Sequence, residues 1–340
     1  MSLATMAADA PATTGSHVAR NDALDFTKGS LVLFMVLYHW LNYFIVLDWD
    51  VYRYLRFITT SFIFITGFLI SNIYLAKYSP LDSRLHTRLL ARGVKLLLLF
   101  TALNVAAALV ISRNGGIRQL QLFFENSFAI YVTGNGRAAF DVLVPIAYSL
   151  ILSPLVLMAA GVFRFSLHAL AATALILAAV TSGTRSASIN VELVAIAMFG
   201  MMAGTIPLGR LHRWLDRPVL LIAGYVLYLW AISVWNILFP LQVIGVSLSL
   251  SLLYVLARAC ATGSGLSRII ISLGKYSLLA YVVHVFVLQV LRGFRGELNG
   301  PTFAAPLIAT LVVTIVTIEL VNAARSRSSS IDRLYRVVFA

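Results

Sequence analysis

The sequence predicts an all-α polytopic membrane protein, a bundle of about ten transmembrane helices whose two ends both lie in the cytoplasm. Hydrophobic residues make up 60% of the 340 residues, charged residues make up only 11%, and the mean hydropathy is +0.90. A soluble domain with a polar exterior cannot be built from this composition. The net charge of +13 is also uneven, because most Lys and Arg fall in alternate connections and in the C-terminal tail. This bias predicts that those connections, and both ends of the chain, face the cytoplasm.

The elements follow from apolar stretches close to the length of roughly 20 residues that a bilayer requires. The candidate spans are residues 28–47, 57–77, 89–111, 140–162, 167–182, 192–208, 218–238, 240–257, 272–291 and 302–323. If the fifth and sixth were both re-entrant, the orientation of the later spans would not change. We expect three regions: a disordered cytoplasmic tail at 1–20, one transmembrane domain at 21–323, and a basic cytoplasmic tail at 324–340.

Several classes of protein are disfavoured by what the sequence lacks. Cys260 is the single cysteine, which excludes an intrachain disulfide and a cysteine metal cluster. There is no Gly-x-Ser-x-Gly, HExxH or Walker motif, which argues against serine hydrolases, zincins and P-loop ATPases. No nucleic-acid motif accompanies the positive charge. We therefore expect neither a bound metal nor a nucleic-acid partner.

The first predicted helix joins a charged hexapeptide, beginning at Leu24, to an apolar segment that carries a histidine. At about 100° per residue, the steps from Lys28 to His39 bring their side chains within about 20° of each other, and Asp25 lies within about 40° of His39. The rise of about 1.5 Å per residue puts Lys28 near a membrane interface and His39 roughly 16 Å deeper. Hydrocarbon offers no partner to an ionisable group at that depth, so His39 is a candidate functional residue.

A compact basic loop, KYSPLDSRLHTRLLARGVK, connects the second and third predicted spans. Arg84, Arg88 and Arg92 are spaced by four and would share one helical face. Two interpretations stay open: the charge only holds the loop in the cytoplasm, or the three guanidinium groups bind phosphate. The long polar connection 112–139 is expected outside. Asp141, just inside the fourth predicted span, either caps that helix or contacts the acceptor substrate.

The last two predicted spans carry further polar side chains. Ser277 and Tyr281 precede a second membrane histidine, His284, by seven and three residues, so all three share one helical face. Glu319 in the last span is a candidate buried carboxylate, with snorkelling toward the cytoplasmic end as the alternative.

Three motifs in order carry a resemblance to a known family. LDFTKG at 24–29 is followed by His39, the second span carries FIFITGFLI at 62–70, and span nine supplies the late histidine. Together they resemble the acyltransferase 3 family of integral-membrane acyltransferases. The chain differs in having Lys28 where the family usually has arginine and Thr66 where it usually has serine. The long serine-to-histidine spacing of span nine resembles the related glucan succinyltransferase and heparan-type N-acetyltransferase branches.

The resemblance implies transfer of an acetyl or succinyl group from cytosolic acyl-CoA to a hydroxyl of a cell-surface glycan or lipid-linked sugar. Acyl-CoA would be a co-substrate, not a permanently bound cofactor, and the protein would lie in a bacterial inner membrane, with a homo-oligomer left open. His39 is the expected general base, because a neutral imidazole with a pKa near ~6.5 can take the hydroxyl proton. Lys28 would bind the donor near the cytosolic mouth, oriented by an i,i+3 ion pair with Asp25. The expected substrate and acyl-CoA contacts are Arg84, Arg88, Arg92, Ser277, Tyr281 and His284.

Two other classes of function remain open. In a transporter or flippase, His39, Asp25, Lys28 and Glu319 would form a proton relay or substrate site. That alternative predicts two related halves with paired broken helices, and the sequence shows no convincing internal repeat. A non-catalytic membrane scaffold would not need polar groups on facing helices.

Overall fold

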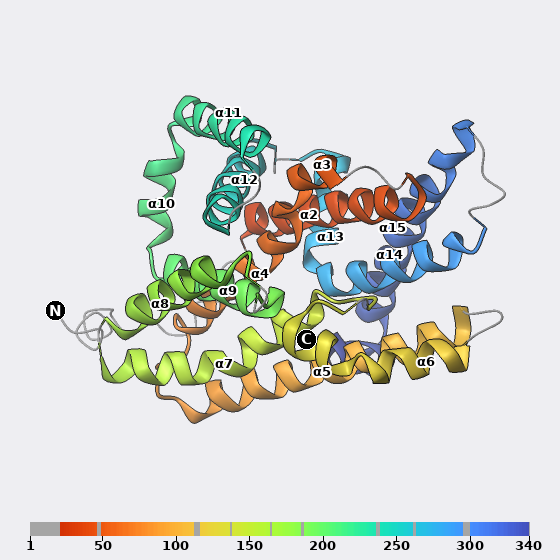
Figure 1. Cartoon of the computed structure of the whole chain (residues 1–340), viewed down its shortest axis with the longest axis horizontal. Coiled ribbons are helices and arrows are strands. Elements are labelled where there is room, and N and C mark those ends of the chain that lie inside the picture. Colours follow the sequence, from red (N-terminus) through yellow and green to blue (C-terminus); the bar gives the residue numbers. More distant parts are fainter. Residues whose placement is uncertain are drawn as a thin grey trace.

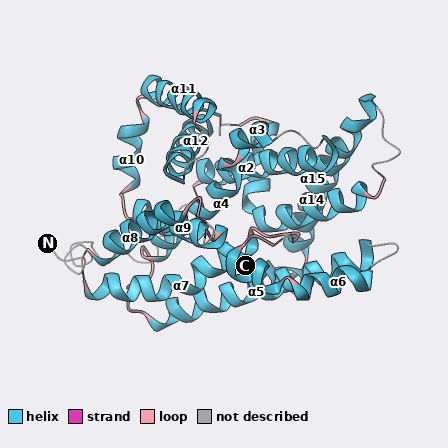
Figure 2. Ribbon diagram, in the orientation of Figure 1, coloured by secondary structure: helices cyan, strands magenta, loops and turns pink. Residues whose placement is uncertain are grey.

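The computed structural model describes residues 21–45, 49–111, 116–136, 138–163, 165–184, 187–235, 239–260, 263–294 and 300–339. Within these ranges the chain is helical, with turns between the helices and no β-strand (Figure 2). The all-α prediction is therefore confirmed. The predicted tail at residues 1–20 lies outside the described residues.

The helices are labelled in Figure 1 as far as space allows. Their bounds, in chain order, are α2 Asp22–Trp40, α3 Trp49–Tyr52, α4 Phe57–Leu69, α5 Ser83–Ile111, α6 Gly116–Glu125, α7 Leu143–Val162, α8 Ser166–Thr181, α9 Ile189–Gly204, α10 Leu208–Leu215, α11 Pro218–Val234, α12 Phe239–Cys260, α13 Gly265–Lys275, α14 Ser277–Arg292, α15 Ala304–Arg327 and α16 Ser329–Phe339. Turns of π-helix extend α2 at Leu41–Ile45 and α4 at Ile70–Tyr74, and another follows α6 at Ala129–Thr133. Short 3₁₀ turns lie at Arg53–Leu55 and Gly300–Phe303.

Several of these helices are suited to a bilayer. Five are long and apolar enough to cross a membrane: Arg53–Tyr74, Ser83–Val110, Leu143–Val162, Phe239–Cys260 and Ala304–Arg327. Two bent helix pairs raise the number to seven when each pair counts as one span. The other predicted ranges correspond to α2, whose charged residues lower its hydropathy, and to the shorter apolar helices α8 and α11. A multi-pass membrane protein is thus supported, while the count of ten and the orientation stay predictions.

The outer surface of the bundle is apolar, the reverse of a soluble protein. Leu98, Val110 and Val219 are 66%, 70% and 76% exposed, and each lies on a predicted span. Polar side chains such as Asp25, Asn104 and His284 are instead buried. This distribution is what contact with lipid requires, because water would penalise such an exterior.

Two pairs of consecutive helices are sharply bent. Within the predicted span 272–291, α13 ends at Lys275 and α14 begins at Ser277, with 91° between their axes. The corner residue Tyr276 is not helical: its backbone angles are φ −110° and ψ 29°. Its hydroxyl donates a hydrogen bond to Asn322 Oδ1 of α15 at 2.8 Å. The predicted span is therefore a bent pair of helices, and a contact remote in sequence is made at its corner. The second bend lies at the end of the predicted span 192–208, where α9 ends at Gly204 and α10 continues from Leu208 at an angle of 100°.

The first helix, α2, lies at the centre of the fold, where it packs against α4, α12, α13, α14 and α15 (Figure 1). Asn21 caps its N-terminus by accepting a hydrogen bond from the Leu24 amide at 3.2 Å. The closest packing is with α13, at Gly29 and Gly274. A Cβ atom at Gly29 would overlap the Ile270 carbonyl, and one at Gly274 would overlap the Asp25 carbonyl. Two glycines therefore let α13 cross α2 beside the Asp25–Lys28 pair.

The remaining helices form a second group around α4, α5, α7 and α9. A glycine allows close packing in this group: Gly67 of α4 faces the Ala197 carbonyl of α9. Helices α5 and α7 lie side by side at one edge (Figure 1). The largest cluster of buried apolar side chains joins this group to α2 through Leu31 and Met35. A site on α2 is consequently enclosed by both groups.

Candidate active site

A cavity of about 370 Å³ lies between α2, α4, α5, α7 and α14, with α16 at its edge. Its walls are largely apolar and include Met35, Ile65, Leu143 and Leu278. Its volume falls within the range of about 300–1,000 Å³ that is usual for small-molecule sites. The cavity is therefore large enough to hold part of a substrate inside the bundle.

Four cationic side chains line this cavity: Lys28, Arg92, Lys95 and Lys275. They come from α2, α5 and the end of α13, in each case from a part of the chain predicted to lie near the cytoplasm. Such convergence from separate helices gives the cavity a strongly positive lining, which favours a ligand with several negative charges. Lys95 and Lys275 were not expected as site residues, because no sequence spacing relates them to Lys28.

The predicted ion pair at the start of α2 is present. Lys28 Nζ lies 2.7 Å from Asp25 Oδ1, with the side chains 16% and 5% exposed. Asp25 is thus buried where α13 crosses, and it holds Lys28 at the cavity wall.

The three arginines predicted to share one face have different surroundings. Arg92 lines the cavity and donates to the Tyr74 hydroxyl, which also lines it. Arg88 is exposed and donates to the Tyr78 hydroxyl at 2.9 Å. Arg84 and Arg88 border a shallow surface groove on α5, outside the cavity lining. The structure therefore brings Arg92 to the other candidate residues and leaves Arg84 and Arg88 on the surface.

Two histidines that are remote in sequence meet deeper in the bundle. The ring centroids of His39 and His284 are 5.5 Å apart, and the residues are 9% and 0% exposed. Within the described part of the chain, both ring nitrogens of His39 and Nε2 of His284 lack a hydrogen-bond partner. Buried polar atoms without partners are rare, so these nitrogens are candidates to bind a hydroxyl group or water.

The backbone fixes the tautomer of His284. Its Nδ1 lies 2.8 Å from the Ala280 carbonyl oxygen. A carbonyl oxygen can only accept, so Nδ1 carries the proton. In the neutral ring, Nε2 is then a lone-pair acceptor, which is the form that can bind a hydroxyl.

Tyr281 connects the cavity to the histidine pair. It lines the cavity, and its ring centroid lies 6.4 Å from that of His39 and 5.5 Å from that of His284. Ser277, one turn earlier, also lines the cavity. The predicted polar face of Ser277, Tyr281 and His284 therefore runs along α14 from the cavity to the histidines.

Aromatic residues surround the histidine pair. Tyr38 and Tyr43 lie against His39 at centroid distances of 5.3 and 5.7 Å, the latter on the π-helical turn after α2. Phe140 contacts the Tyr281 ring at 6.2 Å and has a φ angle of 60°, a left-handed conformation that a bulky side chain rarely adopts. Such strain clusters at functional sites, and nothing in the sequence around Phe140 signalled it.

The two other predicted polar residues, Glu319 and Asp141, differ in their surroundings. Glu319 is exposed, so the buried-carboxylate interpretation is wrong. Asp141 follows Phe140 in the turn before α7 and interacts electrostatically with Tyr38 and Tyr281. In the described ranges, no group of three or more His, Cys, Asp or Glu could hold a metal ion.

The helical fold, the cation-lined cavity and the buried histidine pair define an integral-membrane protein with a candidate site inside its bundle. The model of the acyltransferase 3 family, described as an acyltransferase domain, matches residues 21–320. The chain therefore belongs to the acyltransferase 3 family, and the match supports a membrane acyltransferase. Comparisons with curated proteins and with solved structures gave no match.

Proposed function

We propose that this protein transfers an acyl group, acetyl or succinyl, from cytosolic acyl-CoA to a hydroxyl of a cell-surface glycan or lipid-linked sugar. The observation that carries the proposal is the position of Tyr281, at the junction between a cation-lined cavity and two buried histidines. A polyanionic donor needs the cation-lined cavity, a neutral hydroxyl acceptor needs the histidines, and transfer between them needs the two places to adjoin. The protein would act in the inner membrane of a bacterium.

The donor would occupy the cavity. Its phosphates would pair with Lys28, Arg92, Lys95 and Lys275, which supply point charges from several directions. The apolar walls suit the uncharged arm that carries the thioester. Ser277 also lines the cavity, and its hydroxyl would hydrogen-bond to that arm.

The chemistry would take place at the histidine pair. As the acceptor oxygen attacks the thioester carbonyl, His39 removes the hydroxyl proton, a C–O bond forms and the C–S bond breaks. The proton then passes from His39 to the departing thiolate, so that the products are the ester and CoA. His284 Nε2 accepts a second hydrogen bond and orients the acceptor. The neighbouring rings of Tyr38 and Tyr43 offer faces on which a sugar ring can pack.

The first test is transfer of label. Purified protein is incubated with radiolabelled acetyl-CoA or succinyl-CoA, and label transfer and CoA release are measured. His39→Ala should lower kcat by about 10²-fold or more, the usual contribution of a general base. His168→Ala, a change at an exposed histidine on α8, is the matched control and should leave kcat unchanged. Full turnover in His39→Ala would show that the proposed base is wrong.

A transporter or flippase is the alternative, and the bent pairs α9–α10 and α13–α14 are the observation that favours it. Transporter sites are built at such breaks, and Lys275 and Ser277 flank one of them. Movement of a solute across vesicles by protein that binds no acyl-CoA would support this alternative. Release of CoA that depends on His39 would argue against it.

A further inference from the structure

The last helix, α16, forms part of the cavity wall. It follows α15 after a single non-helical residue, Ser328, whose backbone is extended (φ −137°, ψ 117°). Tyr335, Val338 and Phe339 on its inner side line the same cavity as Lys28 and Arg92. A C-terminal segment therefore stands beside the cations of the proposed donor site.

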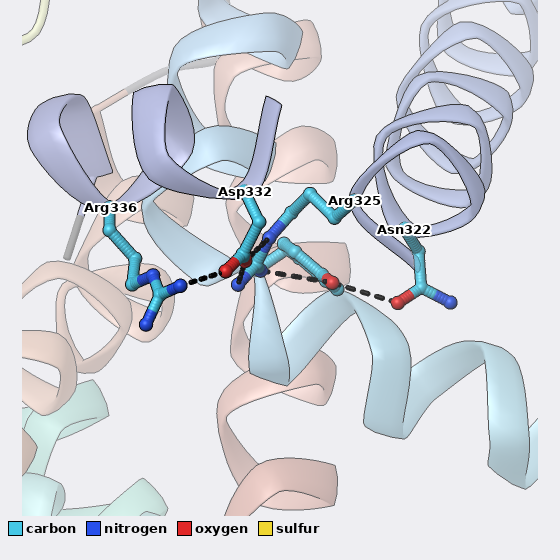
Figure 3. A network of polar contacts seen from close by, with 5 residues as sticks. Asn322, Arg325, Asp332 and Arg336 are labelled. Carbon is cyan, nitrogen blue, oxygen red and sulfur yellow. Dashed lines mark hydrogen bonds and ion pairs between the residues drawn. The ribbon is translucent and has the colours of Figure 1, made fainter. Parts of the chain in front are cut away.

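A compact polar cluster holds α16 in this position (Figure 3). Asp332 Oδ1 accepts hydrogen bonds from Arg325 Nε at 2.8 Å and Nη2 at 2.6 Å, and Oδ2 pairs with Arg336. The Arg325 guanidinium also lies 4.0 Å from the ring centroid of Tyr335. Its Nη1 donates to the Tyr276 hydroxyl at 3.1 Å, at the corner between α13 and α14. Asp332 thus joins α16 to the end of α15 through two guanidinium bonds.

Asp332 is ionised at neutral pH, so its pairs with Arg325 and Arg336 can act as a latch that holds α16 in place. Hydrogen bonds from Arg325, and then the positive charge of Arg336, lower the pKa of Asp332 below its ordinary value. A carboxyl group with a lowered pKa keeps its pairing above its ordinary pKa and loses it only as the pH falls through the lowered value. The latch is therefore closed across the physiological range.

Apart from this latch, α16 is held by two partly buried side chains, Tyr335 and Phe339, which pack against the apolar cluster that includes Tyr276 and Ile318. All 11 residues of this helix are described and none of their side chains is buried, and Ile331, Leu334 and Val337 on its outer side are 42%, 64% and 62% exposed. A helix of this length is marginal in isolation and depends on its docking contacts. Because a single extended residue joins it to α15, detachment requires little rearrangement of the bundle.

We propose that α16 is a strap that closes the cytosolic side of the cavity, with Asp332 as its latch, and that it must move away for the donor to enter. The role assigned to the donor rests on the proposed function, whereas the movement of the strap does not. Tyr335, Val338 and Phe339 line the same cavity as Arg92 and Lys95, so a bulky anion that pairs with these cations has to share the cavity with the three side chains of α16. The strap would thus govern donor entry and product release.

The test measures access to the cavity without any need for activity. Cys260 is replaced by Ser, Thr66→Cys provides a thiol in the cavity lining, and its rate of labelling by a membrane-impermeant maleimide is measured in inside-out vesicles. Asp332→Asn should raise the rate several-fold, and removal of residues 329–340 should raise it at least as much. Asp216→Asn breaks the exposed Arg258–Asp216 pair instead and should leave the rate unchanged. Equal rates with and without residues 329–340 would overturn the strap.

Addition of acyl-CoA separates the strap from the proposed function. If both hold, acyl-CoA slows the labelling of Thr66→Cys, and Asp332→Asn changes KM for the donor more than kcat. If Asp332→Asn speeds labelling but acyl-CoA gives no protection, the strap stands and the donor assignment fails. If acyl-CoA protects but neither Asp332→Asn nor the truncation changes the rate, the donor assignment stands and the strap fails.

Discussion

At the scale of single residues, the backbone gives the two histidines unequal roles. His284 has one nitrogen committed to the Ala280 carbonyl, which leaves Nε2 as its one available acceptor. His39 has both nitrogens unpartnered among the described residues, so it can accept a proton at one nitrogen while the other remains N–H. Either ring can accept a proton at one nitrogen while the other remains N–H, but only His284 is held in a fixed orientation by the backbone, which is why the proposed function uses it to orient the hydroxyl and His39 as the base.

This difference predicts unequal effects of two substitutions at position 284. Glutamine reaches to the position of Nε2 and keeps an acceptor there, whereas asparagine mimics only Nδ1. We expect His284→Gln to retain more activity than His284→Asn, by about fivefold in kcat/KM, the effect of one hydrogen bond of about 1 kcal/mol. Steady-state kinetics of both variants measure this ratio. Equal activities would show that Nε2 does not bind the acceptor.

The proposed role of Lys28 in binding the donor depends on the cations around it. A lysine lacks the bidentate fork of arginine, which would weaken a site built on one residue. Here Arg92, Lys95 and Lys275 share the cavity with Lys28. Several point charges together can neutralise a polyanion without planar recognition by any one of them.

At the scale of elements, the crossing of α2 and α13 decides whether the site is assembled. A methyl group at Gly29 would meet the Ile270 carbonyl, so the helices would have to separate. Lys275 at the end of α13 and the Asp25–Lys28 pair on α2 lie on the two sides of this crossing. Its geometry therefore sets the arrangement of the cations.

We predict that Gly29→Ala destabilises the protein by about 1–3 kcal/mol, the usual cost of overpacking. Thermal unfolding in detergent should show a lower Tm, together with weaker donor binding. Gly209→Ala on α10, where a Cβ atom meets nothing within 4 Å, is the matched control and should leave Tm unchanged or slightly raised. A normal Tm in Gly29→Ala would mean that the two backbones do not approach closely.

At the scale of the whole molecule, the proposed function requires that the cations open toward the cytoplasm. The cavity cations belong to the segments that the charge bias assigns to that side. A cytosolic donor can therefore reach the cavity only if the bundle has the predicted orientation.

The native thiol offers a direct test of orientation. Cys260 is exposed at the end of α12, in a segment predicted to face the cytoplasm. In spheroplasts an impermeant maleimide should label it only after permeabilisation. Asn135→Cys in a Cys260→Ser background, on the predicted outer side, should be labelled without permeabilisation. The reverse pattern would contradict the predicted orientation and the cytosolic donor together.

The sequence by itself determined the helical class, the membrane-like composition, the family motifs and the Asp25–Lys28 ion pair. These follow from composition and from spacing along one helix, where geometry is fixed by about 3.6 residues per turn. Only the tertiary structure decided that His39 meets His284, that Arg92 lines the cavity whereas Arg84 and Arg88 do not, and that α16 reaches the cavity. Those relations depend on how distant helices pack, on glycine contacts and on the corner at Tyr276, and no local pattern specifies them.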